Sequence, residues 1–179
     1  MGVPIIKAVQ WGAPEAPLLV LGPSLGTTAD GLWAVAAAQL AHRFRVLAWD
    51  LPGHGHSPAP TEPFTLAELA EGVLDAVGAD TFVYAGDSVG GAVGLHLLLD
   101  HPERVTAAAL ICTAARFGTP EGWRQRVAKV RASGTPSMIE HSAKVWFAPG
   151  FLEREPARGA ALLHGLQDTD PAGYAAVCD

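Results

Sequence analysis

The residues best suited to do chemistry form the segment Gly86-Asp87-Ser88-Val89-Gly90, in which a serine stands between two glycines. This G-x-S-x-G spacing is typical of a nucleophile elbow, a sharp turn between a strand and a helix that exposes the serine hydroxyl. Such a turn strains the serine backbone and crowds the residues two before and two after it, so both must lack a side chain. Ser88 is therefore the predicted nucleophile.

Two other interpretations of this segment compete with the elbow: an ordinary glycine-rich turn and a dinucleotide-binding turn. The dinucleotide fingerprint is disfavoured, because Ser88 occupies the position where G-x-G-x-x-G requires its second glycine. The helix that follows would point its amino terminus at Ser88, where free N–H groups and the helix dipole favour negative charge. Acyl transfer through the serine is the favoured chemistry.

A second segment, Gly22–Thr27, directly follows an apolar run and contains Pro-Ser-Leu-Gly-Thr. An acyl-transfer site needs two preorganised N–H donors for the oxygen that becomes negatively charged. We predict that Val89, the residue after the nucleophile, supplies one donor and that Leu25 supplies the other. A plain turn at the end of a strand is the alternative for this segment.

A third segment, Asp50–Ser57, holds two histidines among glycines. We interpret it as a structural turn in which Asp50 caps the backbone and the glycines bend it. His54 and His56 are then expected to shape the rim of the cleft. Neither a metal site nor any other cofactor is expected.

Apolar runs alternate with helix-like runs along the first two thirds of the chain, which predicts an α/β fold with a mostly parallel sheet and flanking helices. The expected strands are Ile5–Trp11, Leu18–Leu21, Arg45–Trp49, Thr81–Ala85 and Val105–Cys112. The expected helices run from a cap at Asp30 to about His42, from a Thr65–Glu68 capping box to a stop at Gly78, and over Val89–Asp100. Each of the three segments above directly follows an expected strand.

The pattern changes after Ala115, where helix-like stretches continue without a convincing buried strand. The best of them are Trp123–Ala132, Ser137–Trp146 and Ala157–Leu166. Short helices inserted after a core strand suggest a cap that covers a site. We therefore expect an α/β core over residues 1–115 and a helical cap, or lid, over residues 116–179 that is cut short.

The composition is that of one globular domain or most of one, with 179 residues, 49% of them hydrophobic and 17% charged. There are two cysteines, no apolar run that could span a bilayer and no signal-like start, so we expect a cytoplasmic protein without membrane contact. The net charge of −6 disfavours nucleic acid as a partner. Residues 1–115 hold 4 Lys/Arg against 11 Asp/Glu, whereas residues 116–179 hold 8 against 7, so the second part is more inviting to an anion.

Together these segments resemble the α/β-hydrolase superfamily and, within it, the 3-oxoadipate enol-lactonases of aromatic-compound breakdown. The resemblance extends over essentially the whole chain. Its motifs are Pro23–Thr27, Asp50–Ser57, Gly86–Gly91, His101–Val105, Trp146–Phe151 and Thr169–Tyr174.

This resemblance implies that the protein hydrolyses a small enol lactone that carries a carboxylate, without a cofactor. The product of this reaction would be 3-oxoadipate. Trp123 and Trp146 are expected to wall the pocket. The candidates to hold the substrate carboxylate are the cap cations Arg116, Arg124, Lys129 and Lys144. A carboxylesterase or C–C bond hydrolase of the same superfamily, and a non-catalytic binding fragment, stay open as alternatives.

The family places its catalytic acid and histidine after two further strands beyond the cap. The given sequence departs from this pattern, because Asp179 still lies within what resembles the cap and neither of these strands is present. None of the histidines after Ser88 (His96, His101, His141 and His164) is predicted to be the general base. We therefore expect this chain alone to be largely inactive. We also expect the strand Val105–Cys112 to have an open edge, which favours self-association or a complementing carboxyl-terminal segment.

Overall fold

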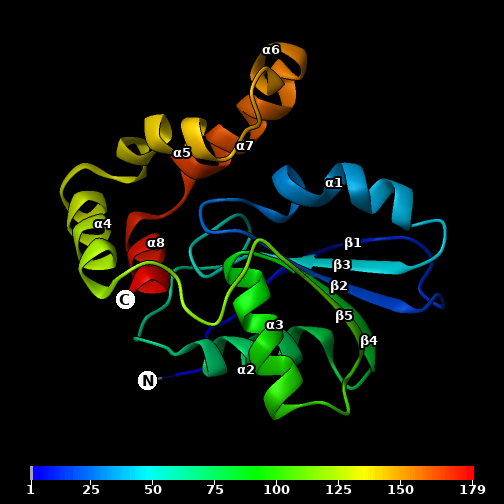
Figure 1. Ribbon diagram of the computed structural model, residues 1–179. Coiled ribbons are helices and arrows are strands. Elements are labelled where there is room, and N and C mark those ends of the chain that lie inside the picture. Colours follow the sequence, from blue (N-terminus) through cyan, green and yellow to red (C-terminus); the bar gives the residue numbers. More distant parts are fainter. Residues whose placement is uncertain (1) are drawn as a thin grey trace.

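A five-stranded sheet organises the computed structural model, which describes residues 2–179 (Figure 1). Its strands are β1 (Ala8–Trp11), β2 (Leu18–Gly22), β3 (Arg45–Trp49), β4 (Phe82–Asp87) and β5 (Val105–Ile111). The spatial order is β1-β3-β2-β4-β5; β1 runs antiparallel to β3 and every other pair is parallel. The predicted fold class is confirmed.

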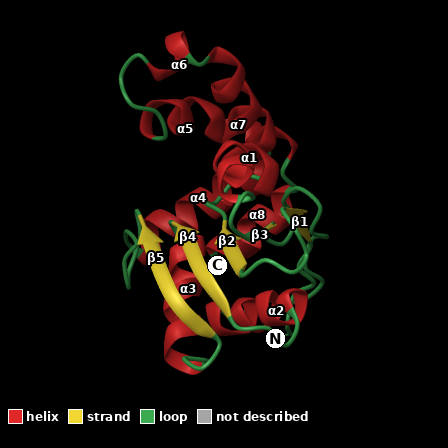
Figure 2. Cartoon of the chain, turned by 90° about the vertical axis from the view of Figure 1, so that its right-hand side faces the viewer, coloured by secondary structure: helices red, strands yellow, loops and turns green. Residues whose placement is uncertain are grey.

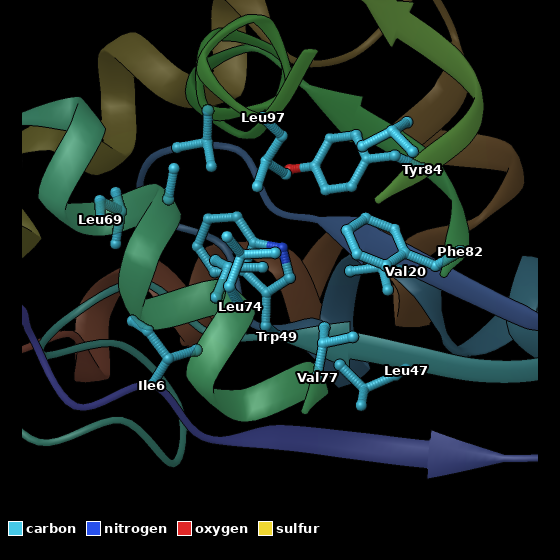
Figure 3. Close-up of a cluster of buried hydrophobic side chains, with 14 of the residues drawn as sticks. Ile6, Val20, Leu47, Trp49, Leu69, Leu74, Val77, Phe82, Tyr84 and Leu97 are labelled. Carbon is cyan, nitrogen blue, oxygen red and sulfur yellow. The ribbon is translucent and has the colours of Figure 1, made fainter. Parts of the chain in front are cut away.

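Helices cover both faces of this sheet, so its central strands are continuous apolar runs rather than alternating ones. The helices α2 (Leu66–Val77) and α3 (Val89–Asp100) lie on one face, and α1 (Ala29–Leu40) lies on the other (Figures 1 and 2). Every residue of β2 is buried. Trp49 and Tyr84 are fully buried in the cluster that the sheet forms with α2 and α3 (Figure 3).

Local sequence signals explain where α2 begins and ends and where α1 begins. The capping box of Thr65 and Glu68 is present, and α2 stops at Gly78, as predicted. The prediction that Asp30 caps α1 is wrong, because Thr28 is the N-cap and its side chain accepts a hydrogen bond from the N–H of Gly31. Thr28 has the extended backbone that a cap requires, whereas Asp30 already lies in the first helical turn.

After β5 the described chain is helical to its end. The elements are α4 (Pro120–Ser133), η1 (Thr135–Met138), α5 (Ile139–Val145), α6 (Phe151–Arg154), α7 (Pro156–Asp168) and α8 (Pro171–Cys178). Residues of α4, η1, α5, α7 and α8 share a small apolar cluster that includes Val130, Met138, Leu166 and Tyr174. The helix expected over Ser137–Trp146 is divided into η1 and α5. No helix within residues 2–179 is long and apolar enough to cross a membrane.

The strand β5 forms one edge of the sheet, as Figure 2 shows. Among the described residues it pairs with β4 alone, as the sequence predicts. Residues 106–109 of this strand are exposed, and the side chain of Ile111 at its carboxyl end is 40% exposed. Leu99, on the neighbouring helix α3, is 75% exposed. The free edge of β5 is therefore unpaired within residues 2–179 and carries exposed side chains, including Ile111.

Candidate active site

Ser88 makes the turn between β4 and α3 by itself, because β4 ends at Asp87 and α3 begins at Val89. Its backbone angles are φ 52° and ψ −113°. Within residues 2–179, only Ser88 and Cys112 combine a side chain with positive φ. The turn is held in place because the N–H of Ser88 donates to Ile111 O at 2.9 Å and the Thr113 hydroxyl donates to Ser88 O at 2.8 Å. Strain of this kind persists only where the surrounding structure enforces it.

The glycines around Ser88 are required by close backbone contacts. A Cβ added at Gly86 would lie 2.5 Å from the carbonyl carbon of Gly90 and 2.7 Å from the nitrogen of Gly91. A Cβ added at Gly90 would lie 2.5 Å from the carbonyl carbon of Gly22. The crowding that the sequence predicts two residues before and after the serine is therefore present.

The first turn of α3 is tied to the segment after β2. The N–H of Gly90 donates to Pro23 O at 2.9 Å, and the buried hydroxyl of Tyr84 donates to Gly90 O at 2.7 Å. Val89, as the first helical residue, has no intrahelical acceptor for its N–H. Among the turn and loop hydrogen bonds of residues 2–179, none uses the N–H of Leu25. Two amides with unused hydrogen-bonding capacity therefore stand at the positions predicted for the oxyanion donors.

His54 holds the neighbouring amide in this segment, a role that the sequence analysis missed. Its Nε2 lies 3.1 Å from the N–H of Gly26, and its Nδ1 lies 3.0 Å from Pro52 O. The side chain is fully buried, so the expectation that it shapes the rim of the cleft is wrong. Nothing in the spacing of the two histidines shows which of them points inward. His56 is the one at the surface, with Nδ1 3.1 Å from Asp50 Oδ2.

Ser88 borders two hollows of different chemistry. The first, of about 540 Å³, is also lined by Leu25, Val89, Arg116 and Trp123. The second, of about 390 Å³, is lined by Asp87 and by the aromatic residues Trp146, Phe147 and Phe151. Burial raises the pKa of the Asp87 carboxyl, and a hydrogen bond with Ser24 partly opposes this. An ester carbonyl at Ser88 would thus have space on both sides.

The predicted substrate-binding residues are placed differently from one another. Trp123 lines the first hollow and Trp146 the second, each together with Ser88. The Arg124 head group lies 2.9 Å from Glu121, and its side chain is 72% exposed. Lys144 pairs with Glu140 at 2.6 Å and is 69% exposed. Neither cation lines a hollow that contains Ser88.

No histidine of residues 2–179 forms a hydrogen bond with the hydroxyl of Ser88. His96 lines the first hollow and its Nδ1 lies 3.2 Å from Asp100 Oδ2. It stands eight residues along α3, however, and at 1.5 Å per residue this is about 12 Å from Ser88. The His96–Asp100 pair is therefore too far away to take the proton of Ser88.

Comparisons with known proteins place this fold among known hydrolases. 3-Oxoadipate enol-lactonase 2 of Acinetobacter baylyi is 31% identical over 177 residues, which cover 97% of this chain and 66% of that protein. The solved structure of the enol-lactonase from Burkholderia xenovorans matches with a TM-score of 0.90 at 36% identity, covering 97% of this chain and 68% of that one. A hydrolase structure from Pseudomonas aeruginosa matches with a TM-score of 0.88 at 35% identity, covering 97% and 66%.

The chain spans about two thirds of the length of the curated relatives it matches. The sequence model of the alpha/beta hydrolase fold matches residues 17–148. This range contains the sheet from β2 to β5 and the turn at Ser88. With a family match over most of its length and the corresponding sheet and turn, the chain belongs to the α/β-hydrolase family.

Proposed function

We propose that this chain carries the nucleophile and the oxyanion donors of a serine hydrolase that acts on carboxylic esters or lactones. The observation that carries the proposal is the strained turn at Ser88, beside the amides of Val89 and Leu25. Attack of the serine oxygen on a carbonyl carbon leaves negative charge on the carbonyl oxygen. The two amides and the amino terminus of α3 would stabilise that charge.

The general base is proposed to come from polypeptide added at the free edge of β5. The carboxyl end of β5 adjoins the nucleophile, because the N–H of Ser88 donates to Ile111 O. A strand paired with β5 would bring the loop at its own end beside Ser88. This added polypeptide is either a complementing carboxyl-terminal segment or a second copy of the chain. Without a base, acylation of Ser88 is expected to be slower by several orders of magnitude.

The helices over residues 116–179 are proposed to form the cap of the site. Trp123 and Trp146, from two different parts of this segment, line the hollows on the two sides of Ser88. The cap would therefore decide which groups can lie on each side of a bound carbonyl.

The proposed substrate is a small lactone bearing a carboxylate, in the class of 3-oxoadipate enol-lactone. The names of the relatives support this class. Arg116 supports it independently, since it lines the first hollow with Ser88 and takes part in no hydrogen bond or ion pair within residues 2–179. The structure therefore favours Arg116 over Arg124 and Lys144 as the group that receives the carboxylate. Asp87 disfavours an anion in the second hollow.

Cysteine usage supports a proposed cytoplasmic location. Cys112 and Cys178 are both free thiols. Free thiols are typical of proteins kept in reducing compartments.

A labelling experiment tests these proposals without requiring turnover. A fluorophosphonate should attach to Ser88 slowly, during long incubation at high probe concentration, because residues 2–179 supply no general base. Peptide mass mapping reads the attachment, and the dicarboxylate adipate should slow it. A charge-assisted contact contributes about 1.5–3 kcal/mol, so Arg116→Gln should weaken protection by adipate about 10- to 100-fold. Arg124→Gln, whose parent side chain pairs with Glu121, is the matched control and should keep the protection.

Three results would count against the proposal. A chain that stays unlabelled at Ser88 even after it is extended by a carboxyl-terminal segment that supplies the general base would instead favour a non-catalytic binding module. Equal protection of the Arg116→Gln and Arg124→Gln variants would remove Arg116 from the site. A parent that is labelled but not protected by adipate would favour an esterase for neutral substrates.

A further inference from the structure

The segment Ser24–Thr27, here called the oxyanion loop, is a tight turn closed by its own residues. The Thr27 hydroxyl donates to Ser24 O at 2.8 Å and accepts from the N–H of Ser24 at 3.2 Å. The N–H of Thr27 also donates to Ser24 O, at 3.1 Å. These bonds leave two amides of the loop to find other partners, namely those of Leu25 and Gly26.

The amide of Gly26 is taken by His54, and this contact defines the chemical state of the ring. Nε2 accepts the Gly26 N–H at 3.1 Å, so this nitrogen must carry no proton. Nδ1 lies 3.0 Å from the carbonyl oxygen of Pro52, so Nδ1 carries the proton and donates it. The arrangement requires the neutral Nδ1–H tautomer. A doubly protonated ring would turn the Gly26 contact into two donors facing each other.

The surroundings of His54 keep the ring neutral. Burial is the main influence and lowers its pKa to about 4. The hydrogen bond to Pro52 and the carboxylates of Asp50 and Asp170 act in the opposite direction, with smaller effects. At neutral pH the ring is therefore in the state that the contact with Gly26 needs.

Helix α8 and the end of α7 pack against His54 and Gly26. The ring of Tyr174 stacks on His54, with centroids 6.1 Å apart and planes 18° apart. The N–H of Asp170 donates to Gly53 O at 2.9 Å, which fixes the start of α8 to the His54 loop. A Cβ added at Gly26 would lie 2.7 Å from the side chain of Leu166 in α7. The oxyanion loop is thus held by two contacts at Gly26: the hydrogen bond to His54 and the packing of Leu166 from α7.

We propose that His54 is a positioning residue for the oxyanion hole, holding Gly26 so that the N–H of Leu25 is presented to a carbonyl at Ser88. Tyr174 keeps the ring in place, so the seating of the cap helices on the core sets the geometry of the oxyanion donor. This inference rests on the proposed hydrolase function. It adds a residue that touches neither the substrate nor Ser88.

The test compares rates of fluorophosphonate labelling at Ser88, because the tetrahedral adduct places an oxygen at the oxyanion position. His54→Phe keeps a stacking ring but has no acceptor for the Gly26 N–H. His54→Gln places an amide oxygen near the position of Nε2 and should restore the contact. Loss of one oxyanion donor lowers turnover by about 100- to 1000-fold. Displacement of a donor should slow the maximal labelling rate by about 10- to 100-fold in His54→Phe, with probe affinity changed far less.

His56→Gln is the matched control, since His56 lies in the same loop but is exposed and contacts Asp50 instead. The inference is supported if His54→Phe is slow while His54→Gln and His56→Gln label within about threefold of the parent. It is overturned if the parent is labelled and His54→Phe reacts equally fast. A parent that stays unlabelled even after it is extended by a carboxyl-terminal segment that supplies the general base overturns the hydrolase proposal itself.

Nitrogen-15 spectra of the imidazole provide a second readout for the case that His54→Phe does not fold. In the parent at pH 7, His54 should show a protonated Nδ1, an unprotonated Nε2 and a coupling across the bond from the Gly26 amide. A protonated Nε2 would overturn the inference, because that nitrogen could not accept the Gly26 N–H.

Discussion

Replacement of Gly86 by alanine would test whether close packing of backbones creates the turn at Ser88. The new Cβ would lie 2.5 Å from the carbonyl carbon of Gly90 and 2.7 Å from the nitrogen of Gly91. Contacts between carbon atoms in packed interiors are about 3.5–4.0 Å, so the first turn of α3 would have to move by about 1 Å. Both opposing atoms belong to the backbone and cannot rotate away as a side chain would.

The size of the effect follows from this geometry. Overpacking by one methylene costs about 1–3 kcal/mol, and a rigid backbone neighbour places Gly86→Ala at the upper end, about 3 kcal/mol. For a domain of this size, 1 kcal/mol corresponds to about 2–4 °C in Tm, so the melting temperature should fall by about 6–12 °C. Calorimetry measures this directly. The labelling rate at Ser88 should fall as well, because α3 carries the amide of Val89.

Gly165→Ala is the matched control, as a helical glycine in α7 whose added Cβ would lie 3.4 Å from the Thr28 side chain. This is an ordinary contact, and alanine gains up to about 1 kcal/mol of helix propensity over glycine. Its Tm should stay the same or rise by a few degrees. A Gly86→Ala protein that melts within about 2 °C of the parent would refute the packing argument.

Three further predictions concern stability. Tyr84→Phe removes the buried hydrogen bond from the Tyr84 hydroxyl to Gly90 O and should lower the free energy of unfolding by about 1–3 kcal/mol in urea denaturation; an unchanged midpoint would contradict this. Thr65→Ala removes the N-cap of α2 and should cost about 1 kcal/mol in the same assay, and a loss below about 0.3 kcal/mol would exclude a functional cap. The pKa of His54 is lowered from 6.5 to about 4 in the folded protein. The neutral ring should therefore contribute about 3 kcal/mol to the free energy of unfolding above pH 6.5, and this contribution is lost as the pH falls towards 4. Asp87, whose pKa is raised, takes up a proton more readily in the folded state and opposes this trend at the acid end. Urea midpoints at pH 7 and pH 4.5 should therefore differ more for the parent than for His54→Gln, and equal differences would contradict the assignment.

The features predictable from the sequence are those set by local rules. The strained turn at Ser88 requires glycine on both sides, and the capping box of Thr65 and Glu68 follows from four residues. Residue types alone do not locate the start of α1, because Thr28 and Asp30 are both good caps and only the path of the chain after β2 decides between them. Short-range patterns therefore identified the elbow but left one helix end undetermined.

The features that could not be predicted depend on long-range packing. His54 and His56 are two residues apart, yet one stacks on Tyr174 in α8 and the other faces solvent. Arg116 and Arg124 are the same residue type in the same segment, so the sequence alone does not distinguish them. In the structure Arg124 pairs with Glu121, whereas Arg116 lines the hollow at Ser88. Neither distinction has a signal in residue spacing.

The most direct test of the central claim is a crystal structure of this chain after reaction with a fluorophosphonate. The account predicts a phosphorus–oxygen bond to Ser88, with the phosphoryl oxygen within about 2.7–3.1 Å of the amide nitrogens of both Leu25 and Val89. Attachment at another residue, or an adduct whose phosphoryl oxygen points to solvent away from these two amides, would contradict it.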